Sequence, residues 1–206
     1  MISVILTCHQ RFNKFEGIIL GWLEQRLVTE VIIVDNSGTF KTRLPDTTVF
    51  SISKNLGPQA KYPFSFMAKN RWVLFADDDI MPIYGIGSDL WRHRHLGVVG
   101  VIGRVFDGKS YYTSTGVRGE NIKEPKKVDG LGGGCTLAPR ELGNVNVMDC
   151  PGMEVDDWWW ETNFEKDLFV IPTDKYIFLK EGKEGLHKTK KCKEMREEFY
   201  ETQQHR

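Results

Sequence analysis

The sequence predicts an α/β protein in which a mostly parallel central sheet is flanked by helices. The first observation is an alternation over residues 1–80, in the order strand, helix, strand, strand, helix, strand. Such an alternation implies right-handed crossovers between parallel strands. The second observation is the wholly apolar run 72–76, which suits a central strand covered on both faces. Three consecutive acids follow this run directly.

The elements of the first half follow from their side-chain patterns. Apolar or β-branched runs predict strands at 2–7, 30–34, 48–53 and 72–76. A helix is expected over 12–25, because its apolar residues repeat at helical spacing, at Phe15, Ile18, Ile19, Trp22 and Leu23. A second helix is expected from about 59 to 70, with Pro58 well placed at its first turn.

The second half is less regular. Its first expected elements are a helix, a fifth strand and an exposed hairpin or loop, at 84–95, 97–105 and 109–128. A helix capped by Asp156 or Asp157 is expected to continue through Phe164 and Leu168. Two short strands and a highly charged helical tail complete the chain, at 169–172, 176–179 and 188–206.

Length, charge and cysteine content limit the function classes. A chain of 206 residues fits one domain with a sizeable core. Lysine plus arginine equals aspartate plus glutamate, 28 against 28, so no global charge points to nucleic acid or an anionic membrane. No apolar run approaches the ~20 residues that span a bilayer, and no signal peptide is expected. The cytosol is therefore the expected compartment, with free thiols at Cys8, Cys135, Cys150 and Cys192.

The acids Asp77, Asp78 and Asp79 form a candidate metal site at the carboxyl end of a strand, where α/β proteins bind ligands. Adjacent carboxylates repel one another, and hard oxygen donors suit Mg²⁺ or Mn²⁺. In an extended segment, Asp77 and Asp79 would point to one side. The alternative is a solvated acidic turn, because Asp is common in turns.

Two further patches are unusual. Four glycines lie at 130–134, directly before a strand expected at 135–138. They cost backbone entropy, which favours a sharp turn or a close approach to a ligand over a flexible linker. Three consecutive tryptophans at 158–160 cannot all face inward on one helix, so at least one is expected to line a surface or a cleft.

Six of these features, in this order, resemble the GT-A class of nucleotide-sugar-dependent glycosyltransferases, and most of all its inverting family 2 group. They are a strand ending at 7–9, a strand ending at 34–37, and the motifs at 55–57, 77–79, 132–135 and 156–157. The resemblance covers roughly residues 2–170. It implies a single GT-A-type Rossmann-like domain over 1–206. This domain would consist of a nucleotide-sugar-binding half at about 1–80, an acceptor-side half at about 81–180, and a C-terminal loop with a charged helix at 181–206.

The resemblance also implies how the nucleotide is bound. Thr7 and His9 would line the base pocket. Asp35 would bond the base, although the usual second acid is here Asn36. The other nucleotide-binding residues that it implies are Asn55, Gly57, Lys61, Asp77 and Asp78.

The metal and catalytic residues come from the same resemblance. Asp79 and Asp77 would bind Mn²⁺ or Mg²⁺, with His187 as a late ligand on a C-terminal loop. The ion would offset the charge that builds on the leaving diphosphate. Asp157, paired with Asp156, would act as general base on the acceptor hydroxyl. Beside the donor sugar and the acceptor would lie Gly133, Gly134 and Trp158.

The implied reaction is transfer of a sugar from a nucleotide-diphosphate sugar, expected to be a UDP-sugar, to an acceptor hydroxyl with inversion. A retaining course would follow if Asp157 lay too far from the acceptor. A non-catalytic sugar-nucleotide-binding protein is an alternative. A nucleotidyltransferase is disfavoured because residues 8–12 contain no glycine. The sequence determines neither the donor sugar, nor the acceptor, nor the oligomeric state.

A second alternative keeps this chemistry but transfers the sugar to a hydroxylated DNA base. A local basic surface would favour it, formed by Lys123, Lys126, Lys127, Lys188, Lys190, Lys191 and Lys193. Zero net charge opposes it, as do the interspersed acids Glu124, Asp129 and Glu194.

Overall fold

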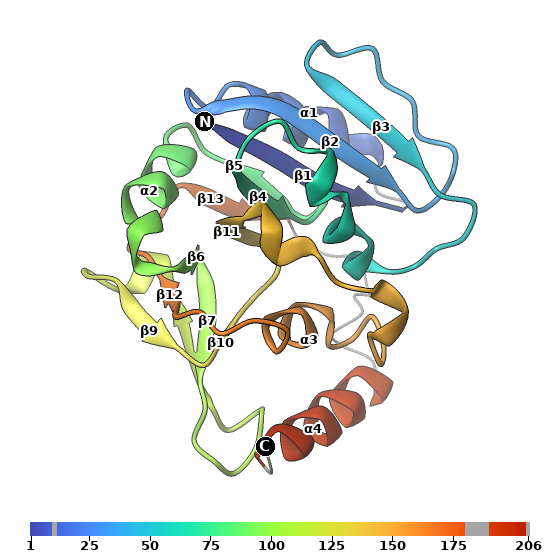
Figure 1. The fold of residues 1–206 in the computed structure, drawn as a ribbon. Helices are drawn as coiled ribbons and strands as arrows, with labels where there is room; N and C mark the ends of the chain where they lie inside the picture. Colours follow the sequence, from blue (N-terminus) through green and yellow to red (C-terminus); the bar gives the residue numbers. More distant parts are fainter. Residues whose placement is uncertain (10–11, 180–189, 205–206) are drawn as a thin grey trace.

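The computed structural model describes residues 1–9, 12–179 and 190–204 and contains a central eight-stranded sheet (Figure 1). Its strands follow the spatial order β3, β2, β1, β4, β11, β6, β12 and β9. Their bounds in that order are Thr47–Ser51, Val28–Asp35, Ile2–Cys8, Trp72–Ala76, Cys135–Pro139, Val98–Gly100, Leu168–Val170 and Lys126–Val128. The predicted α/β class, with a mostly parallel sheet between helices, is confirmed.

The first four strands of the chain pair in parallel, in the order β3, β2, β1, β4. Strand β11 lies antiparallel between β4 and β6, and β12 runs parallel to β6. Because β1, β2 and β4 are parallel neighbours, their carboxyl ends meet at one edge, where Cys8 lies opposite Asp35. Ligands of open α/β sheets bind at this edge.

Side chains of the central strands alternate between two hydrophobic clusters, one on each face of the sheet. On β4, Leu74 and Ala76 belong to one cluster, whereas Val73 and Phe75 belong to the other. All four are fully buried, as the apolar run predicted. This two-sided burial makes β4 the central strand that carries the three acids at its end.

Helices cover both faces of the sheet. On the first face lie α1 (Phe12–Leu23) and α2 (Ile86–His93), and on the second lie η1 (Pro58–Lys61) and α3 (Asp156–Glu161). The remaining short helices are η3 (Arg94–Leu96), η4 (Gly119–Asn121), η5 (Arg140–Gly143) and η6 (Val147–Asp149). The periodicity that predicted the first helix is confirmed, because it buries Phe15, Ile18, Ile19 and Trp22.

The helix expected over 59–70 is wrong. Two 3₁₀ helices occupy this segment, η1 and then η2 (Pro63–Met67). Pro63 explains the interruption, since proline has no backbone N–H and its ring clashes with the carbonyl four residues earlier. The consequence is a tight double turn that holds Lys61 and Tyr62 fully buried against the sheet.

The strand expected over 97–105 is two strands in different sheets. Strand β6 joins the central sheet, whereas β7 (Ile102–Val105) pairs with β8 (Thr115–Arg118) and β10 (Gly130–Leu131). The expected loop at 109–128 therefore contains β8 and ends in β9. A further two-stranded sheet joins β5 (Ile80–Pro82) to β13 (Tyr176–Phe178).

The helix that begins at Asp156 is shorter than predicted. It ends at Glu161, and Leu168 belongs to β12. The side chains of Thr162 and Asn163 donate to the Trp159 carbonyl, at 2.7 and 2.8 Å, and compete with further helical bonding.

The charged tail is helical where the structure describes it, as predicted: α4 spans Lys190–Gln204 and lies beside α3 (Figure 1). Among the described residues, no helix is long and apolar enough to cross a membrane. All four cysteines are free, as predicted.

Candidate active site

Asp35, at the carboxyl end of β2, is fully buried and bonded to its own loop. Its carboxylate accepts hydrogen bonds from the Ser37 amide and hydroxyl, at 2.8 and 2.6 Å, and from the Phe40 amide at 2.9 Å. Burial alone would raise the pKa of Asp35, but these bonds and one from Ser51 hold it below its ordinary value. Thr7 is buried and His9 half-buried at the end of the neighbouring strand. Their contact with a nucleotide stays a prediction.

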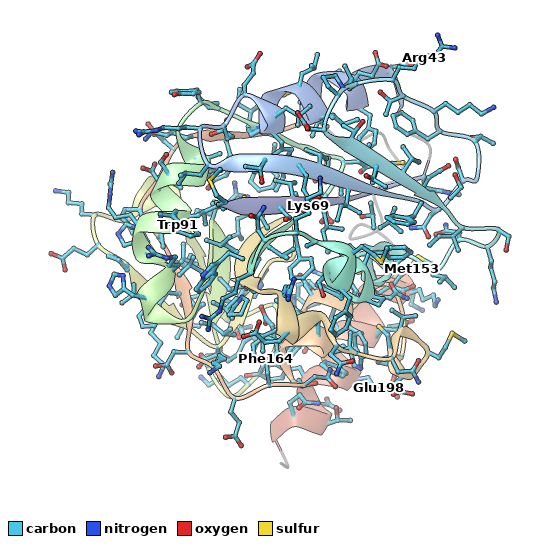
Figure 2. The ribbon with its side chains drawn as sticks, turned by 45° about the horizontal axis from the view of Figure 1, so that its top comes forward. Arg43, Lys69, Trp91, Met153, Phe164 and Glu198 are labelled. Atoms are coloured by element: carbon cyan, nitrogen blue, oxygen red, sulfur yellow. The ribbon has the colours of Figure 1, made fainter. Side chains whose placement is uncertain are left out.

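Asn36 clamps the loop that carries Asn55 and Gly57. Its side-chain amide donates to the Gly57 carbonyl at 3.0 Å and its oxygen accepts from the Leu56 amide at 3.1 Å. The Asn55 side chain accepts from the Gly57 amide at 2.9 Å. Gly57 has a φ of 81°, and a Cβ there would lie 2.7 Å from the Met153 Cβ. Figure 2 shows Met153 beside the helical turns that follow Gly57. The departure at Asn36 thus has a structural role.

Lys61 is fully buried between carboxylates from two segments far apart in the chain. Its Nζ lies 2.6 Å from the Asp77 Oδ1 and 3.9 Å from the Asp156 Oδ2. Burial would lower the pKa of Lys61, but carboxylate charge, that of Asp77 foremost, raises it above its ordinary value. An ammonium therefore joins the end of β4 to the start of α3. Its predicted contact with nucleotide phosphates is untested.

Asp156 is buried at the start of α3. Burial raises the pKa of Asp156 to about 8, with Lys61 opposing the shift and the charge of Asp157 adding to it. Near neutral pH, Asp156 is therefore largely protonated, and the Lys61 ammonium pairs with Asp77. The buried hydroxyl of Tyr62 lies next to Gly133 and has no hydrogen-bond partner among the described residues.

Asp157 is held at the glycine-rich segment. Its Oδ2 accepts from the Gly133 amide at 3.1 Å, and its Oδ1 accepts from the Trp158 amide at 2.9 Å. A Cβ on Gly133 would lie 2.9 Å from the Asp157 Cβ and 3.3 Å from the Lys61 Nζ. Glycine is thus required here by the close approach of side chains from α3 and η1, whereas the expected close approach to a ligand stays a prediction.

Gly134 makes the same kind of approach to the acidic turn. Its carbonyl accepts from the Asp77 amide at 3.1 Å, and a Cβ on it would lie 3.4 Å from the Asp77 Oδ2. The structure therefore brings together six of the predicted site residues, drawn from β4, η1, α3 and the glycine-rich segment. They are Lys61, Asp77, Gly133, Gly134, Asp156 and Asp157.

The three acids form a turn rather than an extended segment, so the alternation that placed Asp77 and Asp79 on one side is wrong. The turn arises because β5 begins at Ile80 and pairs with β13, with the Leu179 amide donating to the Asp79 carbonyl at 2.7 Å. Asp77, Asp78 and Asp79 are all half-buried. His187 lies outside the described residues.

The donor chemistry of this turn fits a divalent cation. Among the described residues, no cluster of three or more metal-ligating side chains occurs. Mg²⁺-type sites commonly use one or two carboxylates and complete their coordination with substrate phosphates. Two carboxylates of the acidic turn satisfy that requirement at the edge of the sheet where a nucleotide would lie.

A cavity of about 330 Å³ adjoins Asp157, and its lining includes neither Lys61 nor the acidic turn. It is lined by Trp158, by Arg104 and Arg118 of the three-stranded sheet β10–β7–β8 (the small sheet), and by Phe106 and Tyr111 of the segment between β7 and β8. All three tryptophans of α3 are at most 7% exposed, because η1, the small sheet and α4 surround that helix. Trp158 nevertheless lines this cavity, as expected for at least one of them.

The tail helix supplies a cation that sequence reasoning missed. The Arg196 Nη1 donates to the Tyr111 hydroxyl at 3.1 Å, and its Nε donates to the Glu154 carbonyl at 2.8 Å. Burial would lower the pKa of Arg196, but the charge of Asp157 is foremost in raising it. A lone arginine in a charged tail carries no signal of this role, which depends on the docking of α4 against α3.

Glu161 was also missed. Both its oxygens accept from the Leu131 amide, at 2.9 and 3.1 Å, and burial raises the pKa of Glu161 well above its ordinary value. Its place in the sequence, within an expected helix, gave no signal of this role. The carboxyl fixes β10 next to α3.

The predicted basic surface is partly neutralised. Lys127 pairs with Asp167 at 2.5 Å, Lys190 with Glu194 at 3.4 Å and Lys191 with Glu154 at 2.9 Å. Lys188 lies outside the described residues. These pairs add to the opposing acids noted in the sequence.

Comparison with solved structures identifies the fold. No protein-family model and no curated protein matches the chain. The crystal structure of GalNAc-T7 with UDP, GalNAc and Mn²⁺ is similar, with a TM-score of 0.63 at 12% identity over 89% of this chain. S. aureus TarS 1–349 is similar with a TM-score of 0.57 at 16% identity over 86% of this chain. The chain spans 44% and 60% of those two structures.

These similarities confirm the GT-A fold that the sequence features predicted. Neither identifies a sequence family, so the assignment to the inverting family 2 group stays a prediction.

Proposed function

We propose that the protein is a metal-dependent glycosyltransferase that moves a sugar from a UDP-sugar to an acceptor hydroxyl with inversion. The observation that carries the proposal is the position of Asp157. Its carboxylate adjoins the Lys61 and Asp77 cluster through Gly133, and it also lines the cavity. A carboxylate that adjoins both the donor edge and a cavity is placed to act on an acceptor. The GT-A fold, and the UDP, GalNAc and Mn²⁺ with which GalNAc-T7 crystallised, support the donor class.

The nucleotide would bind along the carboxyl ends of β1, β2 and β4. Thr7, His9 and Asp35 would meet the base, and Asn55 and Gly57 would lie along the nucleoside. The bonds from Ser37 and Phe40 already orient the Asp35 carboxylate, and its lowered pKa keeps it ionised. Asp35 would therefore offer the base a hydrogen-bond acceptor that is already in position. Asn36 holds the loop at 55–57 through its bonds to Leu56 and Gly57, and this loop would fix the position of the nucleoside.

The acidic turn would bind the cation through Asp79 and Asp77, with His187 as a further ligand. When bound, the ion would supply Lewis-acid stabilisation of the leaving diphosphate. Lys61 holds the Asp77 carboxylate at 2.6 Å and so orients it. Its positive charge, buried beside the donor edge, would also favour the negative charge that develops on the leaving group.

Asp157 would take the proton from the acceptor hydroxyl as that oxygen attacks the anomeric carbon. The Gly133 and Trp158 amides hold both of its oxygens, which fixes the direction of the remaining lone pairs. Gly133 and Gly134, which would lie beside the donor sugar, let Asp157 and Asp77 approach the glycine-rich segment closely. Asp156, protonated near neutral pH, lowers the charge that Asp157 and the diphosphate would otherwise face.

The test is a panel of nucleotide-diphosphate sugars with Mn²⁺, scored by thermal shift and by slow hydrolysis of the donor. The variants are Asp79→Ala and, as control, Asp174→Ala, which removes an exposed acid from the loop before β13. We expect one UDP-sugar to stabilise the wild type and the control by an amount set by its affinity. That shift should need both Mn²⁺ and Asp79.

The outcomes separate the candidate functions. Stabilisation without any turnover, even with acceptors present, would indicate a sugar-nucleotide-binding protein. No shift with any nucleotide sugar would overturn the proposal and leave Asp77 to Asp79 as an acidic turn. The anomeric configuration of the product, read by NMR, distinguishes inversion from retention.

A further inference from the structure

The cavity beside Asp157 lies on one face of the small sheet β10–β7–β8. Directly paired residues of antiparallel strands project to the same face. The register pairs Arg104 with Gly116 and with Gly130, and it pairs Ile102 with Arg118. The two arginines and two glycines therefore share the face that the cavity occupies.

The opposite face of this small sheet is packed into the protein core. Val117 and Leu131 are each 4% exposed and belong to the hydrophobic cluster on the second face of the central sheet. A Cβ on Gly103 would lie 2.8 Å from the Val170 Cγ2. Only the face that bears Arg104 and Arg118 is thus open to a ligand.

Glycines create the space between the two arginines. A Cβ built on Gly116 would meet nothing within 4 Å, although Gly116 lines the cavity. Gly130 and Gly132 line it as well. A sheet face with side chains at these positions would fill the volume. A cavity of about 330 Å³ lies at the lower end of the range that holds small-molecule ligands.

The cavity has two guanidinium groups with weak internal partners. The Arg104 Nη1 donates to the carbonyls of Tyr111 and Ser114, both at 3.2 Å, and among the described residues no carboxylate pairs with it. Arg118 lies 3.7 Å from Glu120 with its side chain 53% exposed, and such surface pairs are weak. Guanidinium groups bind carboxylate and phosphate with matched geometry.

An aromatic wall completes the lining. Phe106 lies 4.7 Å from Trp158, and Tyr111 stacks on Trp158 at 5.5 Å, measured between ring centroids. The Arg104 guanidinium lies 4.4 Å from the Tyr111 ring, which holds the side chain against that wall. A ring-sized molecule with an apolar face, a negative group and a hydroxyl directed at Asp157 would satisfy all of these surfaces.

We propose that this cavity is the acceptor site and that the acceptor is a small hydroxyl compound bearing a carboxylate or a phosphate, which Arg104 and Arg118 bind. The proposal rests on the glycosyl-transfer function proposed above. It names the class of substrate whose hydroxyl Asp157 would deprotonate. The new acceptor–anomeric carbon bond forms as the bond to the diphosphate breaks, and the hydroxyl proton passes to Asp157.

The test uses the full chain, Mn²⁺ and the active UDP-sugar, with acceptors in matched pairs. Methyl glucuronide is compared with methyl glucoside for the carboxylate, and glycerol 3-phosphate with glycerol for the phosphate. We expect kcat/KM to be higher by about tenfold or more for the anionic member of one pair. Arg118→Gln is expected to lower that ratio to about threefold or less, whereas Arg92→Gln, on the distant helix α2, should keep it.

A second variant and a binding measurement make the test independent of turnover. Gly116→Leu has room for its side chain and should block the cavity, abolishing the preference for the anionic acceptor. Without donor, the preferred anion should raise the melting temperature of the wild type by about 2 °C or more, and that of Gly116→Leu by less.

The outcomes distinguish this proposal from the one on which it rests. Donor hydrolysis with equal use of anionic and neutral acceptors would overturn the anionic acceptor alone. Transfer to duplex DNA containing 5-hydroxymethyluracil, with no transfer to either small anion, would also overturn it. Absence of both donor binding and donor hydrolysis would overturn the glycosyl-transfer function. In that case, anion binding that Gly116→Leu removes would still support the anion site.

Discussion

The Lys61 ammonium lies 2.6 Å from the Asp77 carboxylate and is fully buried, with Asp156 3.9 Å away on its other side. This single side chain connects the acidic turn after β4 with the start of α3. The two segments are nearly eighty residues apart in the chain. The arrangement links the geometry of the proposed metal-binding edge to that of the proposed general base, because Asp157 follows Asp156 directly.

Replacing Lys61 should destabilise the protein. Lys61→Met leaves the half-buried Asp77 carboxylate without its buried cation, and we expect a loss of about 2–4 kcal/mol, since breaking such a pair is costly. Urea unfolding measures it. The control is Lys69→Met, because Lys69 (labelled in Figure 2) is 76% exposed and lies 3.6 Å from Glu30. Its loss should be about 0–1 kcal/mol. Equal effects of the two substitutions would contradict the role given to Lys61.

Asp156 should make stability fall as the pH rises. The pKa of its carboxyl is 3.8 when unperturbed, and burial raises this pKa to about 8 in the native state. The native state therefore holds an extra proton between these two pH values. The stability that it contributes is complete below the lower value and is lost as pH rises through the higher one. Asp156→Asn cannot ionise, so its melting temperature should fall less than that of the wild type between about pH 5 and about pH 9. Asp174→Asn controls for net charge, and parallel curves for the wild type and Asp156→Asn would refute the assignment.

Gly133 should not tolerate a methyl group. In Gly133→Ala, the added Cβ would lie 2.9 Å from the Asp157 Cβ and 3.1 Å from the Tyr62 hydroxyl, so the Asp157 side chain must shift. We expect donor turnover to fall by about 10²-fold, as for small displacements of catalytic groups. Gly17→Ala on α1 is the control, because its Cβ would make an ordinary 3.7 Å contact with Met81. Unchanged turnover in Gly133→Ala would show that Asp157 need not be held in place.

Much of the fold could be predicted from local patterns. The apolar run 72–76 predicted a central strand, and its four core residues are divided between both faces of the sheet. The helical spacing of Phe15, Ile18 and Trp22 predicted the face that α1 buries. These signals are local, since each is read from one segment. The sequence also contains the signal that interrupts the helix expected at 59–70, because Pro63 lies within that segment.

The site was predictable only in part. The glycine-rich segment and Asp157 were expected to share it, and they are joined by a hydrogen bond from Gly133. The small sheet was not foreseen, because pairing of β7 with β8 and β10 depends on register between distant segments. Arg104, inside the strand expected over 97–105, therefore carried no signal of a binding role. The position of Arg196 near Asp157 likewise depends on how α4 docks.

The measurement that tests the account most directly is donor turnover by Asp157→Asn, compared with the wild type at saturating UDP-sugar and Mn²⁺. The asparagine keeps the size of the side chain but removes the base. We predict that donor affinity, read by thermal shift, stays within about threefold while turnover falls by about 10²–10⁴-fold. A variant that binds the donor and turns it over within about fivefold of the wild-type rate would contradict the assignment of Asp157 as general base.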